Sequence, residues 1–311
     1  MEKYFKMSFE HVFSQMIILF IVLIIGYVAN KAGFLDSVSN KKISSLIMNL
    51  AIPCKVLSSL NQAECTGKDL VTMTVVTALT FLLLMVFAKI VPIVLCTKGE
   101  KAPILEFMTV FSNNGFMGYP VIEAVLGASA LIYAGVYSIF TVVLFFSYGV
   151  YLFQKSKAGI DKIEWRKMIS PSSIGGTLAL ILAFFEFRFS EVPYEVLSMI
   201  GGVTTPLSML IIGSSLAAIP LKEVFKGWRV YAFSVIRLMV VPAIVYLVFF
   251  KFISNPMILG VIVLTAAMPS ASTAVMFAEQ YDNNAPYAAQ HVFITTLFAV
   301  LTIPIVGQML F

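Results

Sequence analysis

Polar and helix-breaking residues interrupt a long apolar segment at FSNNGFMGYP, residues 111–120. Asn113 and Asn114 carry amide N–H donors, which suit an oxyanion such as a carboxylate. Gly115 and Gly118 permit a tight turn and a close crossing of another helix, and Pro120 weakens the helix that follows. The stretch therefore predicts a broken helix that binds a polar ligand, although the amides could instead cap the helix after the break.

A second break is predicted at AMPSASTAVMFAEQYD, residues 267–282. Pro269 takes the place of the first proline, and Ser270, Ser272 and Thr273 offer hydroxyls where the first break offers amides. Hydroxyls in membrane helices often bond back to their own helix carbonyls, so that alternative stays open for these three residues.

Composition indicates a helical membrane protein. The 311 residues are 59% hydrophobic and 12% charged, about half the charge of an average soluble domain. Apolar runs of bilayer-spanning length recur along the whole chain. They predict ten transmembrane helices, at 13–29, 43–60, 70–95, 103–126, 130–153, 171–187, 195–217, 229–252, 256–278 and 286–310.

Basic residues set the predicted orientation. The loops after odd-numbered segments hold thirteen Lys and Arg residues, against five on the opposite side. The positive-inside rule places the thirteen in the cytoplasm and both termini outside. The first segment has no cleavage-site pattern and is interpreted as a retained crossing, with the cell membrane as the expected location.

The two halves of the chain resemble each other in opposite orientation. MNLAIPCKVLSSL matches GGVTTPLSMLIIGSSL, pairing Pro53 with Pro206, and KIVPIV matches LMVVPAIV, pairing Pro92 with Pro242. These matches and the two breaks predict an inverted repeat of five plus five helices, residues 1–153 and 171–311, joined by a cytoplasmic loop at 154–170. Symmetry then brings the broken fourth and ninth helices together near the midplane, where half-helix N-termini favour an anion.

Polar residues of the second and seventh segments are further candidates. Pro53 and Pro206 are expected to kink these helices beside the site. Asn49, Thr204, Thr205 and Ser208 could complete the cavity wall or form hydrogen bonds between helices.

Few charged residues fall within the spans, and an intramembrane charge is a functional hypothesis by default. Lys55, two residues after Pro53, is a candidate ligand or counter-charge for the substrate, and His291 could relay protons. Lys89, Glu106, Glu123 and Arg237 complete the set. Most of the set is expected near helix ends, where side chains reach the interface.

Enzyme and metal signatures are missing from the sequence. It has no nucleotide-binding glycine motif, no G-x-S-x-G and no H-E-x-x-H, and its two histidines and three cysteines are widely spaced. We predict neither an enzyme, a metal site nor a cofactor.

FSNNGFMGYP and AMPSASTAVMFAEQYD, in this order, resemble the two crossovers of the auxin efflux carrier family. The resemblance implies an elevator mechanism. Helices 1, 2, 6 and 7 form a scaffold that also dimerises, and helices 3–5 and 8–10 form the transport domain. Asn113 matches the family's substrate-binding asparagine. Ser112 stands where plant members have proline, and their charged pair in the third helix has no counterpart in this chain.

These observations predict a secondary transporter of a small organic anion, such as malate, malonate or an auxin-like acid. Coupling to protons or sodium stays open. The alternatives are a sodium-coupled symporter of the bile-acid type and a membrane receptor derived from a transporter.

Overall fold

The computed structural model describes residues 9–62, 65–155, 171–217, 225–281 and 283–310. Within these ranges the chain is helical, and its β-structure is one isolated bridge between Ser112 and Ser270. Five helical segments of the described residues are long and apolar enough to cross a membrane, and three shorter apolar helices accompany them. The predicted all-helical membrane class is confirmed. Most of the predicted 154–170 loop lies outside the described residues.

The helices follow the predicted segments in order. Their bounds are α1(Phe9–Lys31), α2(Ser37–Leu46), η1(Ile47–Ala51), α3(Ile52–Ser59), α4(Gly67–Val94), α5(Lys101–Val110), η2(Asn114–Gly118), α6(Tyr119–Leu126), η3(Ala128–Ala130), α7(Leu131–Leu144), η4(Phe145–Gly149), α8(Val150–Lys155), α10(Pro171–Phe184), α11(Glu191–Gly202), α12(Thr204–Ala217), α14(Trp228–Val235), η5(Ile236–Val240), α15(Val241–Phe249), α16(Pro256–Ala267), α17(Thr273–Gln280) and α18(Ala285–Leu310).

Several crossings contain a π-helical turn directly before a proline. The turns η1, η2 and η5 precede Pro53, Pro120 and Pro242, each of which sits in the first turn of the next helix. Proline lacks an N–H, and a wider turn before it avoids a clash with the preceding carbonyls. The repeated prolines of the sequence therefore mark local changes of helical winding.

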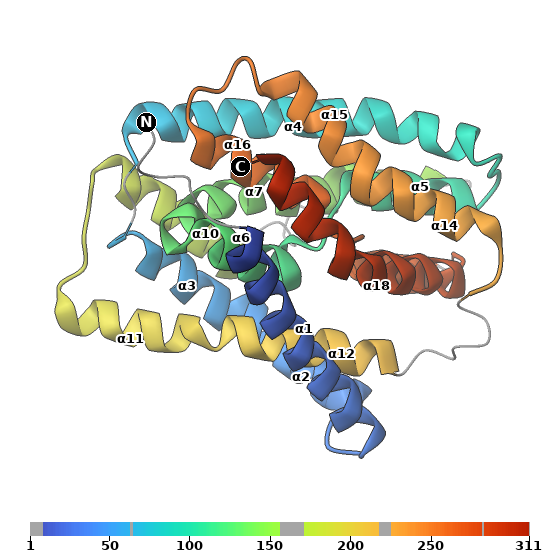
Figure 1. Ribbon diagram of the computed structural model, residues 1–311, viewed down its shortest axis with the longest axis horizontal. Helices are drawn as coiled ribbons and strands as arrows, with labels where there is room; N and C mark the ends of the chain where they lie inside the picture. The colour runs from blue at the N-terminus through green and yellow to red at the C-terminus, as the bar shows by residue number, and fades with distance from the viewer. Residues whose placement is uncertain (1–8, 63–64, 156–170, 218–224, 282, 311) are drawn as a thin grey trace.

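Two groups of helices lie on opposite sides of the molecule (Figure 1). Helices α2, α3, α11 and α12 run along one side, α4, α14 and α15 along the other, and α1 and α18, which contact each other, lie between them. Helices α1 and α12 approach closely: a Cβ added at Gly26 would lie 2.1 Å from the Leu210 carbonyl oxygen, and one at Gly213 would lie 1.8 Å from that of Leu23. Small residues allow such contact between membrane helices, so α1 and α12 form a tightly packed pair.

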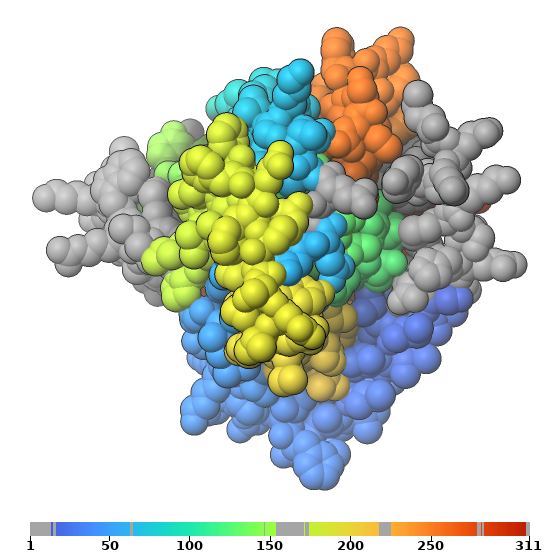
Figure 2. Space-filling view, turned by 90° about the vertical axis from the view of Figure 1, so that its left-hand side faces the viewer, coloured from blue at the N-terminus to red at the C-terminus, as the bar shows by residue number. Residues whose placement is uncertain are grey.

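Connections between helices gather at the two ends of the molecule. Figure 2 shows the end that holds the α3–α4, α10–α11 and α15–α16 connections. Asn61 exchanges hydrogen bonds with the Phe189 backbone there, and Asn255 donates to Asp69. At the opposite end Arg229 donates to the Leu95 carbonyl. These hydrogen bonds join connections that lie far apart in the sequence.

Candidate functional site

Two broken helical segments meet in the interior. Helix α5 ends at Val110 and α16 ends at Ala267, and the extended residues that follow them pair at the Ser112–Ser270 bridge. The Asn113 N–H donates to the Pro269 carbonyl at 2.9 Å, and the Ala271 N–H donates to that of Phe111 at 3.2 Å. We call residues 111–113 and 268–272 the paired breaks. Each break satisfies backbone groups of the other, which makes irregular backbone tolerable at this depth.

A small cavity of about 70 Å³ lies beside the paired breaks. The breaks and the helices after them form one part of its wall, and η1 and α3 supply Met48 and Ile52 from a different crossing. Its lining residues are uncharged: Met48, Ile52, Ser112, Asn113, Asn114, Gly115, Phe116, Tyr119, Ser138, Thr141, Val142, Phe145, Ala271, Ser272 and Thr273.

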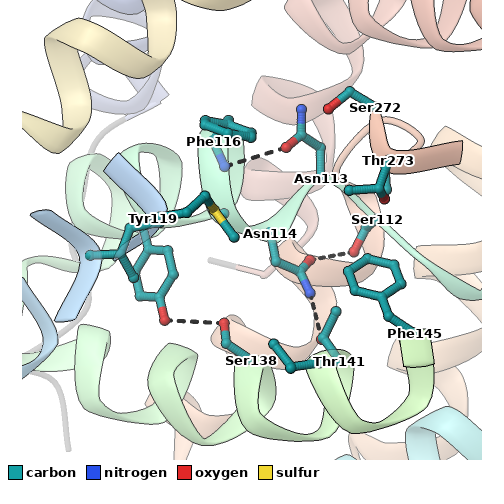
Figure 3. A pocket seen from close by; sticks show the side chains of 15 residues that line it. Ser112, Asn113, Asn114, Phe116, Tyr119, Ser138, Thr141, Phe145, Ser272 and Thr273 are labelled. Atoms are coloured by element: carbon teal, nitrogen blue, oxygen red, sulfur yellow. Dashed lines mark hydrogen bonds between the residues drawn. The ribbon is translucent and has the colours of Figure 1, made fainter. Parts of the chain in front are cut away.

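Asn113 lines this cavity and caps the half-helix after the break. Its Oδ1 accepts a hydrogen bond from the Phe116 N–H at 3.3 Å. Its Nδ2 has no hydrogen-bond partner among the described residues and is turned away from Phe116, on the side of Ser272 (Figure 3). Capping and ligand binding are therefore compatible, because the two functions use different atoms of one amide.

Both polar atoms of the Asn114 side-chain amide form hydrogen bonds. Its Oδ1 accepts from the Ser112 hydroxyl, and its Nδ2 donates to Thr141 Oγ1 at 2.9 Å (Figure 3). The side chain lines the cavity but uses its polar atoms to join the first break to α7. The two neighbouring asparagines thus have different environments, which the sequence could not distinguish.

The predicted residues of the second break also lie in different environments. Ser272 and Thr273 line the cavity, and Thr273 Oγ1 is buried with no partner among the described residues. Ser270 is fully buried outside the lining, where its N–H donates to Thr295 Oγ1. Pro269 contributes its carbonyl to the paired breaks.

The glycines and proline of the first break have distinct surroundings. A Cβ on Gly115 would lie 3.1 Å from Met48 Sδ, so this glycine allows close contact with η1. A Cβ on Gly118 would make only ordinary contacts, the nearest at 3.6 Å. Pro120 lies in the first turn of α6.

The candidates from the second and seventh segments lie outside the cavity lining. Asn49 is exposed and donates to Ser45 Oγ at 3.0 Å. Ser208 and Thr204 are fully buried, and their hydroxyls have no partner among the described residues. Pro53 follows the turn η1, and Pro206 follows the interruption between α11 and α12 at Val203.

Lys55 also lies outside the lining and forms an ion pair. Its Nζ is 2.6 Å from Glu123 Oε2, and the Thr205 hydroxyl donates to the same oxygen at 3.2 Å. The sequence identified Lys55 and Thr205 as candidates but did not connect them with Glu123.

Two other ionisable residues of the predicted spans are buried away from the cavity lining. Arg237 is not near a helix end: it lies in the middle of its crossing, is fully buried, and its Nη1 donates to the Ala266 carbonyl at 2.6 Å. Its cationic group thus lies at the negative end of α16, where the helix dipole favours it. His291 is buried against Phe233 and Tyr287, away from the cavity lining, and its Nδ1 bonds the Tyr287 carbonyl.

Comparison with known proteins agrees with this architecture. A family model described as "Membrane transport protein" matches residues 11–306. An uncharacterized transporter of Methanocaldococcus jannaschii is 27% identical over 305 residues, which cover 94% of this chain and 97% of that protein. Another, from Methanothermobacter thermautotrophicus, is 24% identical, with 92% and 94% covered. The chain therefore belongs to the membrane transport protein family, the auxin efflux carrier family that its motifs resemble, and its relatives are transporters, not enzymes.

Proposed function

We propose that this membrane transporter moves a small organic anion, a mono- or dicarboxylate, through a site at the paired breaks. The observation that carries the proposal is the free Nδ2 of Asn113 at the cavity, an N–H donor with no partner among the described residues. A carboxylate oxygen is a strong acceptor for such a donor. The cavity volume of about 70 Å³ favours a small acid over a bulky one.

The helix ends around the cavity support an anionic ligand. The half-helix that begins at η2 and the helix α17 both start at cavity-lining residues, Asn114 and Thr273. Helix N-termini carry about half a positive charge and unpaired N–H groups. Two such ends beside uncharged polar side chains favour a negative group without a permanent counter-ion.

We further propose that the paired breaks are the crossover of a five-plus-five inverted repeat. In this proposal α1–α3 and α10–α12 form a scaffold that dimerises, and α4–α8 and α14–α18 carry the site across the cell membrane by an elevator motion. The separation of the two groups of helices in Figure 1 and the tight α1–α12 pair support this division. The basic loops place the termini outside.

The test is binding and transport by the purified protein. A thermal-shift screen against malonate, malate and auxin-like acids, at two pH values and with or without sodium, identifies the ligand. Counterflow of that ligand in proteoliposomes then measures transport. Asn113→Ala should weaken binding about 10- to 100-fold, since a hydrogen bond to a charged group contributes roughly 1.5–3 kcal/mol.

Asn49→Ala is the matched control, because it removes the same amide from an exposed position outside the cavity. We expect it to retain the affinity of the unmodified protein. Equal affinities of the Asn113→Ala variant and the unmodified protein would exclude the proposed site. Sodium-dependent uptake would instead favour a sodium-coupled symporter.

A further inference from the structure

One ion pair joins three separate crossings beside the cavity. Lys55 on α3 lies 2.6 Å from Glu123 on α6, and Thr205 on α12 lies within 3.3 Å of both charged groups. The two side chains differ in exposure, at 5% for Lys55 and 34% for Glu123. The carboxylate is therefore partly accessible, while the ammonium group is buried.

Lys55 and Glu123 lie on the same helix faces as residues that line the cavity. Met48 and Ile52 line the cavity, and Lys55 follows Ile52 by three residues. On the facing helix Tyr119 lines the cavity, and Glu123 follows it by four. Residues three or four apart share a helix face. The ion pair therefore lies about one turn from the cavity, on the surface where α3 meets α6.

Lys55 is fixed to the helices on its own side of that surface. A Cβ added at Gly201 of α11 would lie 2.6 Å from the Lys55 Cα, and one at Gly175 of α10 would lie 2.7 Å from the Pro53 Cβ. These close contacts pack α3 against α10 and α11. Glu123 belongs to α6, which continues from the first break. Movement of the paired breaks relative to α3 must separate the two charges.

Separating the charges leaves Lys55 buried without an anion, which is strongly unfavourable. Protonation of Glu123 removes the attraction that holds the pair together, and Lys55 then needs another anion. Under the proposed function, the available anion is the substrate carboxylate. Binding of a proton and binding of the substrate therefore favour each other.

We propose that Glu123 is the proton-binding site of this transporter, and that one proton moves with each substrate anion. This inference rests on the proposed function. The Glu123 carboxylate takes a proton from water on one side of the membrane and becomes a neutral acid. Lys55 remains an ammonium ion throughout. On the other side the acid returns the proton to water, and the ion pair forms again.

The elements packed against α6 supply few other titratable groups. Helix α3 brings Lys55, and α12 brings the Thr205 hydroxyl. Tyr27 and Lys31 of α1 contact each other, and Lys31 also donates to the Ala217 carbonyl. On α7, Tyr137 stacks on Phe81, and Tyr133 lies beside Asp69. Among the described residues, Lys55 is therefore the charged group paired with Glu123.

The first experiment measures uphill uptake of radiolabelled malonate into proteoliposomes, with the membrane potential held at zero by potassium and valinomycin. One proton per anion gives up to about tenfold accumulation for each unit of pH gradient, since tenfold corresponds to 1.4 kcal/mol. Glu123→Gln should abolish this accumulation, whereas the control Glu106→Gln, which alters an acid outside the cavity lining, should retain it. Accumulation retained in Glu123→Gln overturns the inference, whereas absence of malonate counterflow from the unmodified protein argues against the proposed function.

A second measurement needs no substrate. Amide hydrogen exchange in lipid nanodiscs, corrected for the intrinsic effect of pH, reports opening of residues 114–126. We expect exchange to increase at low pH in the unmodified protein and to be high at every pH in Glu123→Gln. The same pH dependence in both proteins contradicts the inference even if malonate is not transported.

Discussion

The two buried cations of this transporter have different partners. Arg237 is fully buried and bonds a backbone carbonyl of α16. Lys55 is almost as buried, but its partner is the partly exposed carboxylate of Glu123 from another helix. A carbonyl at a helix end does not titrate, so protonation of the partner does not break the Arg237 contact. The Lys55 contact depends on whether Glu123 carries a proton.

This difference distinguishes a buried charge that supports the fold from one that takes part in function. Arg237 donates to a carbonyl of a helix that ends inside the protein, at a point where α16 has no further turn to donate N–H groups to its last carbonyls. Lys55 instead joins α3 to α6 and α12, and we propose that α3 and α6 separate during transport. Burial alone therefore does not identify a functional charge. The chemistry and location of the partner do.

The largest expected effect comes from Arg237→Ala. The substitution leaves a cavity and an unpaired Ala266 carbonyl, and large-to-small changes in a core cost roughly 3–5 kcal/mol. Thermal unfolding in detergent measures the loss. Lys89→Ala is the control, because this basic residue is exposed on α4 and its change should stay within about 0.5 kcal/mol. Equal melting temperatures for the two variants would contradict a structural role for Arg237.

Glu123→Ala should cause the next largest loss of stability. It leaves Lys55 buried and unpaired, which costs roughly 3 kcal/mol. Lys55→Met should cost about 1 kcal/mol or less, because the remaining carboxylate is partly exposed to water. The double variant should recover most of the loss seen in Glu123→Ala. Additive effects in this double-mutant cycle would show that the two side chains do not interact.

Substitutions of the two adjacent asparagines should have different kinds of effect, one on stability and the other on ligand binding. Asn114→Ala should lower stability by roughly 1–3 kcal/mol, because it breaks buried hydrogen bonds with Ser112 and Thr141. Asn113→Ala should lower stability by only about 1 kcal/mol, the usual effect of losing a helix cap, while reducing stabilisation by the ligand in line with the weaker binding. Melting curves with and without ligand separate the two effects. The reverse pattern would assign substrate binding to Asn114.

The smallest effect is expected for Asn49→Ala. The side chain is exposed and bonds only Ser45 among the described residues, so stability should change by no more than about 0.5 kcal/mol. Uptake should also be unaffected. A clear loss of uptake would extend the site to the second crossing, as the sequence first suggested.

Much of the helical architecture was predictable, because hydrophobic length and basic loops report directly on the membrane. Among the described residues, five apolar helical segments are long enough to cross a membrane and three shorter apolar helices accompany them, and helices end at Val110 and Ala267, where the two breaks are predicted. The family was predictable from the motifs around those breaks. These properties depend on residues close together in the chain, whose types decide whether a helix can continue.

The partners of individual polar atoms were not predictable. Asn113 and Asn114 are identical side chains one residue apart, yet one has a free N–H at the cavity and the other is engaged with α7. The burial and the partner of Arg237 were not predicted, because hydropathy does not show what a single charge contacts within a crossing. Lys55 and Glu123 are separated by 68 residues, so their contact depends on packing.

The sequence by itself determined that this protein is a helical membrane transporter with two broken segments. Apolar length, charge depletion and helix-breaking residues act locally, and lipid imposes the same requirements on every crossing. Only the tertiary structure decided which amide faces the cavity, which cation supports α16 and which carboxylate holds Lys55. Those outcomes depend on side-chain direction and on contacts between distant helices, because a buried polar group must find its partner wherever the fold places one.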